Sequence, residues 1–407
     1  MKLRQFNKSR KQKRILIGSF LGIIVLVGSI LLYRSYALYK EEKTFNVIRG
    51  KVPSFVNGDL EIAIMVDGES TSALPSKGSY GVSILCDKEA TGYWDYEEWG
   101  PNIRTITTKT KSTIQFRTNF SQMLINKSQN DSTIEKIDHE ATKQTPALTD
   151  YRYVGAKPNN YMYFGCSDTC TEDNLYRIIG VISVQSSEEG KYEERVKLIK
   201  AINWDGSTAK NTEYSSSGKG YMWTKNTSMN WWSTSPLNAT LNEEFYNSLG
   251  DYKEFIDLAK WYLGEPKVSG ASAYTPEGFY VAERNTAGIR NEANIVANVG
   301  LLYPSDYGYS IGKEYQDQSI YTNREKYVSS AWLYNLSGGE YYEWTITPDY
   351  DNDYTVWAIR YPGSLSTDNV TSNVNYLGVR PTFYLKWNVK YKSGDGSPSS
   401  PYLLKID

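Results

Sequence analysis

Histidine and cysteine are nearly absent from this sequence, and their scarcity excludes several kinds of catalytic and metal site. The 407 residues include one histidine, His139, and three cysteines. A Ser–His–Asp or Cys–His arrangement would have to use His139, but the polar segment around it, IEKIDHEATKQ, predicts a solvent-exposed side chain. A structural zinc site needs four closely spaced cysteine or histidine ligands, which the sequence does not contain. We therefore expect neither nucleophilic catalysis nor a zinc centre.

A strong net charge is also missing, although charge is unevenly distributed along the chain. The formal net charge is −1, yet seven basic residues and no acidic residue precede Ile15. The remainder carries 38 lysines and arginines against 46 acids, a net charge of −8. Nucleic-acid binding needs a basic surface that neutralises phosphates. The acidic remainder therefore argues against nucleic acid as a partner.

One long uncharged run follows the basic residues. Residues 15–33, ILIGSFLGIIVLVGSILLY, contain no charge over nineteen positions, close to the ~20 residues that a helix needs to span a bilayer core. With the basic tail 1–14 on the cytoplasmic side, the run predicts a single-pass anchor in the cell membrane over 15–36, and an extracellular remainder. The alternative is a signal peptide cleaved after Ala37, although signal-peptide apolar regions are shorter, roughly 7–15 residues.

Two parts of different composition follow the anchor. Residues 44–120 contain short β-branched runs separated by turn residues, which predicts a small antiparallel β-sandwich, with Trp94 and Trp99 as core anchors or loop clasps. Residues 121–150 are rich in Ser, Thr, Asn, Gln and Lys and poor in aromatic residues. Because such a segment buries too little apolar area to offset its ordering entropy, we expect a flexible linker.

The remaining residues, 151–407, show the pattern of a mixed domain. The runs NLYRIIGVISV and RVKLIKAI predict a β-hairpin, and short strands recur later in the chain. Two segments, residues 235–249 and 254–263, repeat apolar residues at helical spacing. The expected fold class is therefore α+β. Cys166 and Cys170 flank a turn of the first hairpin and are expected to form a disulfide outside the cell rather than to bind a metal.

Several motifs of residues 151–406 occur in an order and spacing that resemble one protein family. They are YRIIGV, NWWSTSPLNATLN at the start of a predicted helix, LLYPSDYGY, AWLYN, EWTITP and GVRPTFYL. On these motifs the chain resembles a large family of anchored surface proteins of low-GC Gram-positive and mollicute-like bacteria. The front unit resembles the small β-domain often joined to it, through the motifs FNVIRGKVPSF, VDG, ALPSKGSYGV, CDKEATGYW and WGPNI.

The resemblance implies that the C-terminal domain is distantly similar to C-type-lectin-like folds, which include formylglycine-generating enzymes and retroelement-diversified binding proteins. In those folds a G-[FV]-R motif lies on a late core strand, here residues 378–380, and Arg380 is expected to be buried and paired. Formylglycine-generating activity would need a cysteine pair late in the domain, and no cysteine follows Cys170. Relatives often carry a cysteine where this chain has Ser112, which leaves Cys86 without that partner.

An acidic loop between two predicted strands is a candidate calcium site. Calcium takes about 6–8 oxygen ligands from carboxylates, carbonyls and water. The candidate ligands are Asp349, Asp351, Asn352 and Asp353. The loop lacks the Gly and Glu of an EF-hand, and a solvated turn without metal is the favoured alternative. No other cofactor is expected.

Aromatic and polar loops of the C-terminal domain predict a binding function. Tyr and Trp supply rigid amphipathic contacts, while Ser and Asn adapt their hydrogen bonds to a partner. The candidate ligand-binding residues are Trp344, Trp357, Tyr361 and Tyr376, of which the two tryptophans could instead belong to the core. The leading hypothesis is a membrane-anchored extracellular binding module, adhesin-like, that recognises a glycan or a protein without catalysis.

Two other functions are alternatives to this hypothesis. One is an extracytoplasmic carbohydrate-active hydrolase, which needs two carboxylates roughly 5–9.5 Å apart. The acids available for such a pair are Glu283, Asp306, Glu343, Asp349 and Asp351. The other is a structural envelope protein in which the β-domain serves as a stalk or assembly unit. Because a sequence contains no distances between side chains, the choice depends on the tertiary structure.

Overall fold

The computed structural model of the chain describes residues 60–405 with several gaps. The gaps are 67–68, 76–79, 87–90, 96–97, 105–109, 168, 187–191, 205–220, 225–231, 268–273, 286–292, 335–341, 372–376 and 388. The predicted basic tail and membrane anchor, residues 1–36, lie outside the described residues. Among the helices of the described part, none is both long enough and apolar enough to cross a membrane.

The chain divides into two compact units. The first comprises residues 1–77 and 82–116, and the second comprises residues 78–81 and 117–407. The division at Phe116 lies close to residue 120, where the small β-domain was expected to end. Helices and several sheets occur together in the described residues, so the expected α+β class is confirmed.

The first unit contains a four-stranded sheet and a separate hairpin. The sheet has the order β2-β1-β6-β3, with β1 at Leu60–Val66, β2 at Glu69–Thr71, β3 at Tyr80–Cys86 and β6 at Thr110–Thr118. The hairpin pairs β4 (Thr91–Asp95) with β5 (Gly100–Arg104). The expected purely antiparallel sandwich is wrong in one respect, because β1 and β6 pair in parallel. The long connection between these strands permits the crossover that parallel pairing requires.

Trp94 and Trp99 have the two roles that the sequence predicts for them. Trp94 is buried, and its ring packs edge-on against Phe116 at 4.9 Å and against Trp99 at 5.3 Å between ring centres. Trp99 donates its indole N–H to the carbonyl of Pro75 at 2.9 Å. One tryptophan therefore anchors the core of the first unit, and the other ties a loop to the hairpin.

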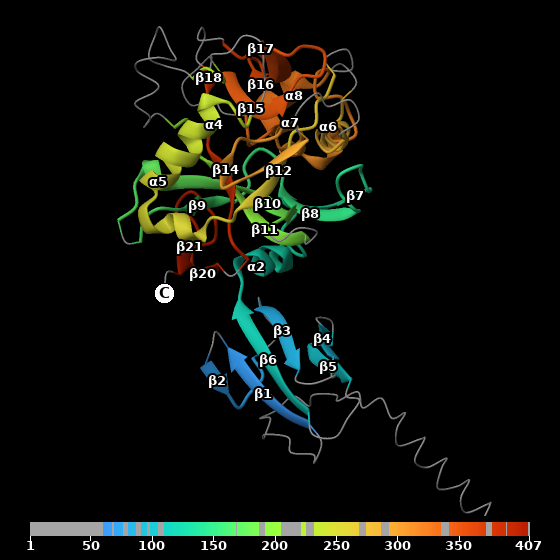
Figure 1. Cartoon of the computed structure of the whole chain (residues 1–407), viewed down its shortest axis with the longest axis vertical. Helices are drawn as coiled ribbons and strands as arrows, with labels where there is room; N and C mark the ends of the chain where they lie inside the picture. Colours follow the sequence, from blue (N-terminus) through green and yellow to red (C-terminus); the bar gives the residue numbers. More distant parts are fainter. Residues whose placement is uncertain are drawn as a thin grey trace, which may run out of the picture. The chain divides into compact units, whose positions relative to one another are not determined.

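The second unit is organised around a seven-stranded antiparallel sheet (Figure 1). Its order is β14-β19-β11-β10-β8-β7, and β9 pairs with β10 beside this path. The strands are β7 (Ile134–His139), β8 (Leu148–Tyr153), β9 (Tyr161–Tyr163), β10 (Leu175–Gln185), β11 (Tyr192–Lys200), β14 (Val299–Gly300) and β19 (Thr382–Tyr384). The predicted hairpin is confirmed, because β10 and β11 pair along most of their length.

A second sheet of four strands lies at one end of this unit with helices α6, α7 and α8 around it, and α2 lies at the opposite end (Figure 1). Its order is β17-β16-β15-β18, with strands β15 (Tyr342–Pro348), β16 (Thr355–Arg360), β17 (Ser364–Asn369) and β18 (Leu377–Gly378). Two short pairs complete the strands: β12 (Ala259–Tyr262) with β13 (Asn294–Ala297), and β20 (Lys390–Ser393) with β21 (Leu403–Lys405).

The helices of the second unit are short. They are α2 (Phe120–Lys127), α4 (Pro236–Thr240), α5 (Tyr246–Ser248), α6 (Pro276–Glu283), α7 (Pro304–Tyr309) and α8 (Arg324–Ser330), with single helical turns η1 (Glu172–Asn174), η2 (Leu241–Phe245), η3 (Gly250–Phe255) and η5 (Lys313–Tyr315). The helix predicted from residue 235 is confirmed, since α4, η2 and α5 follow one another without a break. Its face of Leu237, Leu241 and Phe245 is buried.

The second predicted helix, residues 254–263, is wrong in its C-terminal half. Only the turn η3 forms at its start, and Ala259–Tyr262 is instead strand β12, paired with β13. Leu258, counted on the apolar helical face, is 41% exposed, whereas Trp261 packs against Tyr384 with ring centres 5.0 Å apart. A short apolar run fits both periods, and pairing with a strand distant in sequence decided between them.

The predicted flexible linker, residues 121–150, is also wrong, because this segment forms structured parts of the second unit. Asn119 caps helix α2 by accepting the backbone N–H of Ser121 at 2.8 Å, and Phe120 and Leu124 are buried. The next strand, β7, pairs with β8 along six residues. A composition average misses these elements, because a few well-placed apolar residues and backbone pairing with β8 stabilise an otherwise polar segment.

Candidate functional site

Two of the four predicted ligand-binding residues belong to the core. Trp344 on β15 and Trp357 on β16 are both 0% exposed. Trp344 donates its indole N–H to the carbonyl of Tyr221 at 2.7 Å, and Trp357 donates to the carbonyl of Pro266 at 3.2 Å. The prediction that these tryptophans contact a ligand is therefore wrong, because a fully buried indole with an occupied N–H has no surface to offer.

Tyr361 is exposed and belongs to a tyrosine-rich area next to β16. Its side chain is 60% exposed, and the neighbouring guanidinium of Arg360 lies 4.9 Å from the ring centre of Tyr342. Burial raises the pKa of Tyr334, and the nearby hydroxyls of Tyr361 and Tyr342 raise it further. We call Tyr342, Arg360 and Tyr361, together with Tyr334, which is only 9% exposed, the Tyr361 patch. The fourth predicted residue, Tyr376, lies outside the described residues.

The predicted calcium ligands lie in a hydrogen-bonded turn between β15 and β16. Asp349 accepts the hydroxyl of Thr355 at 2.7 Å and the backbone N–H of Asp351 at 3.1 Å. Asn352 accepts the backbone N–H of Tyr354 at 3.2 Å, and Asp353 belongs to the same turn. In the described part of the chain, no three His, Cys, Asp or Glu side chains are placed to share a metal ion. These bonds have the geometry of the metal-free turn considered from the sequence.

The acids on which a hydrolase would depend are mostly buried. Glu343 is paired with Arg380, whose Nε and Nη2 donate to its two carboxylate oxygens at 2.8 and 2.7 Å. The expectation that Arg380 is buried and paired is thereby confirmed. Glu283 accepts the backbone N–H of Ser305 at 2.8 Å, and Asp306 belongs to the network described next. Because these three carboxylates are buried and bound to protein groups, a glycosidic bond has no access to them.

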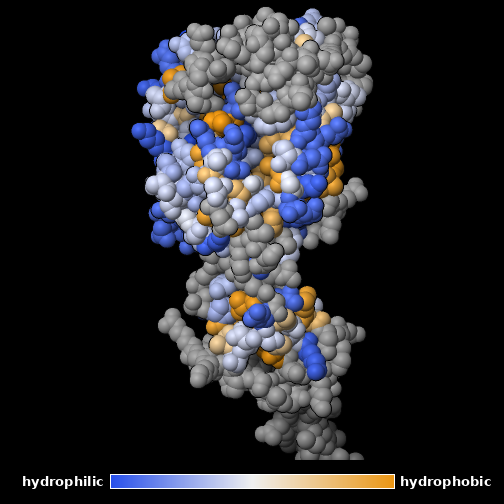
Figure 2. Space-filling view, turned by 90° about the vertical axis from the view of Figure 1, so that its left-hand side faces the viewer, coloured by the Kyte–Doolittle hydropathy of each residue, from blue (hydrophilic) through white to orange (hydrophobic). Residues whose placement is uncertain are grey.

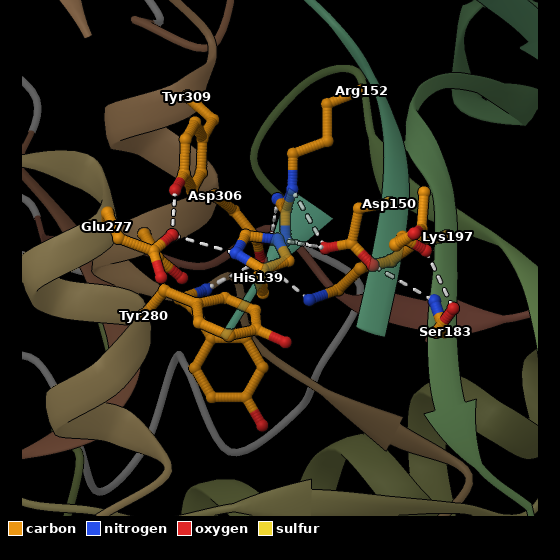
Figure 3. A network of polar contacts seen from close by, with 12 residues as sticks. His139, Asp150, Arg152, Ser183, Lys197, Glu277, Tyr280, Asp306 and Tyr309 are labelled. Carbon is orange, nitrogen blue, oxygen red and sulfur yellow. Dashed lines mark hydrogen bonds and ion pairs between the residues drawn. The ribbon is translucent and has the colours of Figure 1, made fainter. Parts of the chain in front are cut away.

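A cluster of buried charges surrounds His139 (Figure 3). Asp150 lies 3.1 Å from His139 Nε2 and accepts Arg152 Nη2 at 2.8 Å. Arg152 also donates from Nη1 to Asp306 at 2.8 Å, and Lys197 Nζ donates to the other oxygen of Asp306 at 2.6 Å. His139 itself is 3% exposed, so the expectation of a solvent-exposed histidine is wrong. Polar residues flank His139 in the sequence, but β7 brings it against Asp150 of β8.

The ring of His139 is held on all sides. Its Nδ1 lies 2.8 Å from Glu277, while Nε2 faces Asp150 (Figure 3). The ring stacks on that of Tyr280 with ring centres 3.6 Å apart, and the guanidinium carbon of Arg284 lies 3.7 Å from the centre of the Tyr280 ring. Groups at such distances occupy opposite faces of Tyr280. The ring of His139 is therefore fixed by contacts with two carboxylates and by stacking on Tyr280.

Burial and charge pairing act against each other in this network. Burial would raise the pKa of Asp150 and of Asp306, but the guanidinium of Arg152 and, for Asp306, the ammonium of Lys197 hold both pKa values below their ordinary range. Burial lowers the pKa of Lys197 to about 8, against the attraction of Asp306. Burial also raises the pKa of Glu283 to about 7, against the attraction of Arg284. For Asp150 and Asp306 the neighbouring cations outweigh burial, whereas for Glu283 burial outweighs the attraction of Arg284.

Local features of the sequence place these groups in the network, but the network was not among the predictions made from the sequence. Asp150 and Arg152 alternate on β8, so both side chains lie on one side of the sheet, and Lys197 interrupts the apolar strand β11. Asp306 caps the start of α7 by accepting the backbone N–H of Tyr303 at 2.9 Å. Charges at alternating positions of a strand, and a lysine inside an apolar strand, were the signals available. Only their meeting in space makes them one network.

The network holds several charges, but it offers little contact with solvent. The side chains of His139, Asp150, Arg152 and Asp306 are at most 2% exposed, whereas the side chain of Glu277 is 41% exposed. The network therefore links several strands and helices of the second unit, and among these five side chains solvent reaches mainly Glu277. This geometry fits a structural role better than substrate chemistry.

The cysteines take the pairing that the sequence predicts. Cys166 and Cys170 form a disulfide with Cα atoms 5.4 Å apart. Cys86 is a free thiol, and Ser112 Oγ lies 3.3 Å from its sulfur. Ser112 is therefore adjacent to Cys86 in this structure.

Comparison of the chain with known family models, curated proteins and solved structures finds no match. The resemblance of its motifs to anchored bacterial surface proteins, and of its second unit to C-type-lectin-like folds, therefore stays a prediction.

Proposed function

We propose that the chain is a membrane-anchored extracellular binding module without catalytic activity, which recognises a glycan through the Tyr361 patch. The observation that carries the proposal is the 60% exposure of Tyr361 beside the other tyrosines of the patch. A tyrosine ring combines an apolar face with a polar hydroxyl. A sugar presents the same combination of C–H faces and hydroxyl groups, so the patch is chemically matched to it.

The position of the patch next to a rigid element supports a binding role. Hydrophilic and hydrophobic residues are mixed on the face of the molecule drawn in Figure 2. Loops on a rigid scaffold commonly carry binding, and the patch follows the end of a buried strand, β16. The resemblance to C-type-lectin-like folds supports the same function for the second unit.

Membrane attachment is proposed from the sequence. The uncharged run of residues 15–33 and the basic residues before it support a single-pass anchor with a cytoplasmic N-terminus. On this topology both compact units lie outside the cell. The disulfide between Cys166 and Cys170 is compatible with that oxidising location.

A glycan array probed with the intact chain, with and without calcium, tests the proposal. We expect binding to at least one glycan class, and a loss of at least about tenfold in affinity for Tyr361→Ala, equivalent to about 1.4 kcal/mol. Tyr93→Ala is the matched control, because Tyr93 is 62% exposed but belongs to the first unit. A hit that needs calcium would assign a role to the loop of Asp349–Asp353. A folded chain that binds no glycan in either condition would contradict the proposal.

A further inference from the structure

Arg177 is a cation on β10 whose position is set by aromatic rings. It is directly opposite Tyr161 in the antiparallel pairing of β9 and β10. Its guanidinium lies over the ring of Tyr161 at 3.9 Å and over the ring of Trp332 at 4.7 Å from the ring centres. Such contacts hold a guanidinium by cation–π attraction and by stacking. The side chain is only part-buried, so solvent reaches it.

The groups that hold Arg177 are themselves held in place. Its Nε donates to the side-chain oxygen of Asn160 at 2.6 Å. Asn160 is fully buried, and it exchanges hydrogen bonds with the backbone of Ile178, both at 2.8 Å. Trp332 donates its indole N–H to the carbonyl of Tyr153 at 2.7 Å. The guanidinium is thus pre-organised, which lowers the entropy cost of binding a ligand.

The charge of Arg177 has no carboxylate partner in the described part of the chain. Its Nε donates to a neutral amide oxygen, and no described acceptor binds its terminal nitrogens. The charged side chain that affects the pKa of Arg177 is Arg380, which is also positive. Glu343 already neutralises Arg380. Burial and the positive charge of Arg380 lower the pKa of Arg177 to about 10, although the neighbouring Tyr161 acts in the opposite direction. A partly buried cation whose terminal N–H groups have no described acceptor is a site that an anion would stabilise.

The Arg177 site and the Tyr361 patch flank the same short segment. Trp332 contacts Arg177, and Tyr334, two residues later, belongs to the Tyr361 patch. Two residues of chain span at most ~7 Å. Because the backbone of Trp332 and that of Tyr334 lie this close, both places are assigned below to one glycan of a few sugar units.

We propose that Arg177 binds the carboxylate of an acidic sugar in the glycan that the Tyr361 patch recognises. The planar guanidinium matches a carboxylate in a bidentate, charge-assisted pair. This inference rests on the proposed function and specifies its ligand class. The acidic sugar supplies the anion, and its neighbouring sugar units contact the tyrosines.

Binding of small probes to the full chain, measured by calorimetry, tests this site. The probes are glucuronic acid and N-acetylneuraminic acid, compared with glucose and acetate. We expect an acidic sugar to bind at least tenfold more tightly than glucose and acetate. Arg177→Met should abolish this preference, and Arg177→Lys, which keeps the charge but loses the fork, should weaken acidic-sugar binding at least tenfold. Acetate that binds as tightly as the acidic sugars would overturn the assignment to a sugar.

Lys127→Gln is the control for Arg177→Met. Lys127 also lies against a tyrosine ring, 5.3 Å from the centre of Tyr402, but it has a carboxylate partner, Asp131, at 3.5 Å and belongs to neither proposed site. Its loss should therefore leave the preference for acidic sugars intact. Circular dichroism and the Tm of each variant establish that it is folded. If Arg177→Met retains the preference, the Arg177 site is refuted. If neutral glycans still bind through Tyr361 in that case, the proposed function survives without it.

Discussion

Arg152 and Arg177 lie on neighbouring strands of one sheet, and their electrostatic surroundings are opposite. Arg152 on β8 is fully buried between two carboxylates and also lies over a tyrosine ring, at 5.0 Å from its centre. Arg177 on β10 also lies against aromatic rings, but no carboxylate of the described residues pairs with it. Aromatic contacts orient both guanidiniums. Only in the first case does the protein also neutralise the charge.

A charge that the protein neutralises internally has a structural role, whereas a charge without such neutralisation is available to a ligand. In the His139 network each cation has a buried acid within hydrogen-bond distance, so removing one member leaves its partner as an uncompensated buried charge. Arg177 leaves no such acid behind when it is removed. Substitutions should therefore affect stability in the network and ligand binding at Arg177.

Arg152→Met should have the largest effect. It leaves Asp150 and Asp306 buried without their shared cation, and breaking a buried pair costs roughly 3–5 kcal/mol of unfolding free energy. Urea denaturation measures this loss. The matched variant Arg177→Met removes a cation that has no carboxylate partner among the described residues, but it leaves the buried side-chain oxygen of Asn160 without its donor. Its cost should therefore be smaller, about 1–3 kcal/mol. Equal losses in the two variants would show that Arg177 has an internal partner.

Trp344→Ala should have the next largest effect on the unfolding free energy. It extends the comparison of buried and available groups to aromatic residues. Trp344 is fully buried and its truncation leaves a cavity, for which a loss of roughly 3–5 kcal/mol in unfolding free energy is typical. Tyr361→Ala removes an exposed ring and should change the unfolding free energy by less than about 0.5 kcal/mol. Thermal and urea unfolding of both variants check this order. A stable Trp344→Ala protein that has lost glycan binding would restore Trp344 as a ligand contact.

Glu283→Gln tests the network through pH, with a smaller expected effect. Burial raises the pKa of Glu283 from 4.5 to about 7, so its stabilising contribution is complete below pH 4.5 and is lost as the pH rises through about 7. This group should lower the unfolding free energy of the natural chain by up to about 3 kcal/mol over that range. The Gln variant should lack this decrease.

The lowered pKa values of Asp150, Asp306 and Glu277 act in the opposite direction. Their contribution is present above the unfolded pKa values and is lost as the pH falls through the folded ones, so it affects acid denaturation below about pH 4. In the range from pH 5 to 7 the raised carboxyl pKa values act instead, that of Glu283 and, through burial, that of Glu343. Identical unfolding curves for Glu283→Gln and the natural chain across that range would refute the assigned shift.

Features that depend on near neighbours in the chain could be predicted. Cys166 and Cys170 are close enough in sequence to meet across a turn, and the four-residue spacing of Leu237, Leu241 and Phe245 marks one face of a helix. The pairing of β10 with β11 follows from two apolar runs with a short polar connection. In each case the interacting residues are within one hairpin or one helix, so local spacing carries the information.

Features that depend on distant segments could not be predicted in the same way. The polar composition of residues 121–150 suggested a linker, but docking of Phe120 and Leu124 and pairing of β7 with β8 made it part of the fold. Trp344 and Trp357 suggested ligand contacts, but a large aromatic side chain suits a core as well as a binding surface. The sequence pattern does not contain the exposure that distinguishes these uses.

Residue type and spacing were sufficient for the α+β class, the disulfide and the hairpin of β10 and β11, because these features depend on residues close in the chain. Only the folded chain brings His139 to Asp150 and Glu277, and only there is Arg152 neutralised while Arg177 has no carboxylate partner among the described residues. Electrostatic compensation depends on separations of a few ångströms between groups that can be more than a hundred residues apart in the chain. Those separations exist only after the sheets have formed.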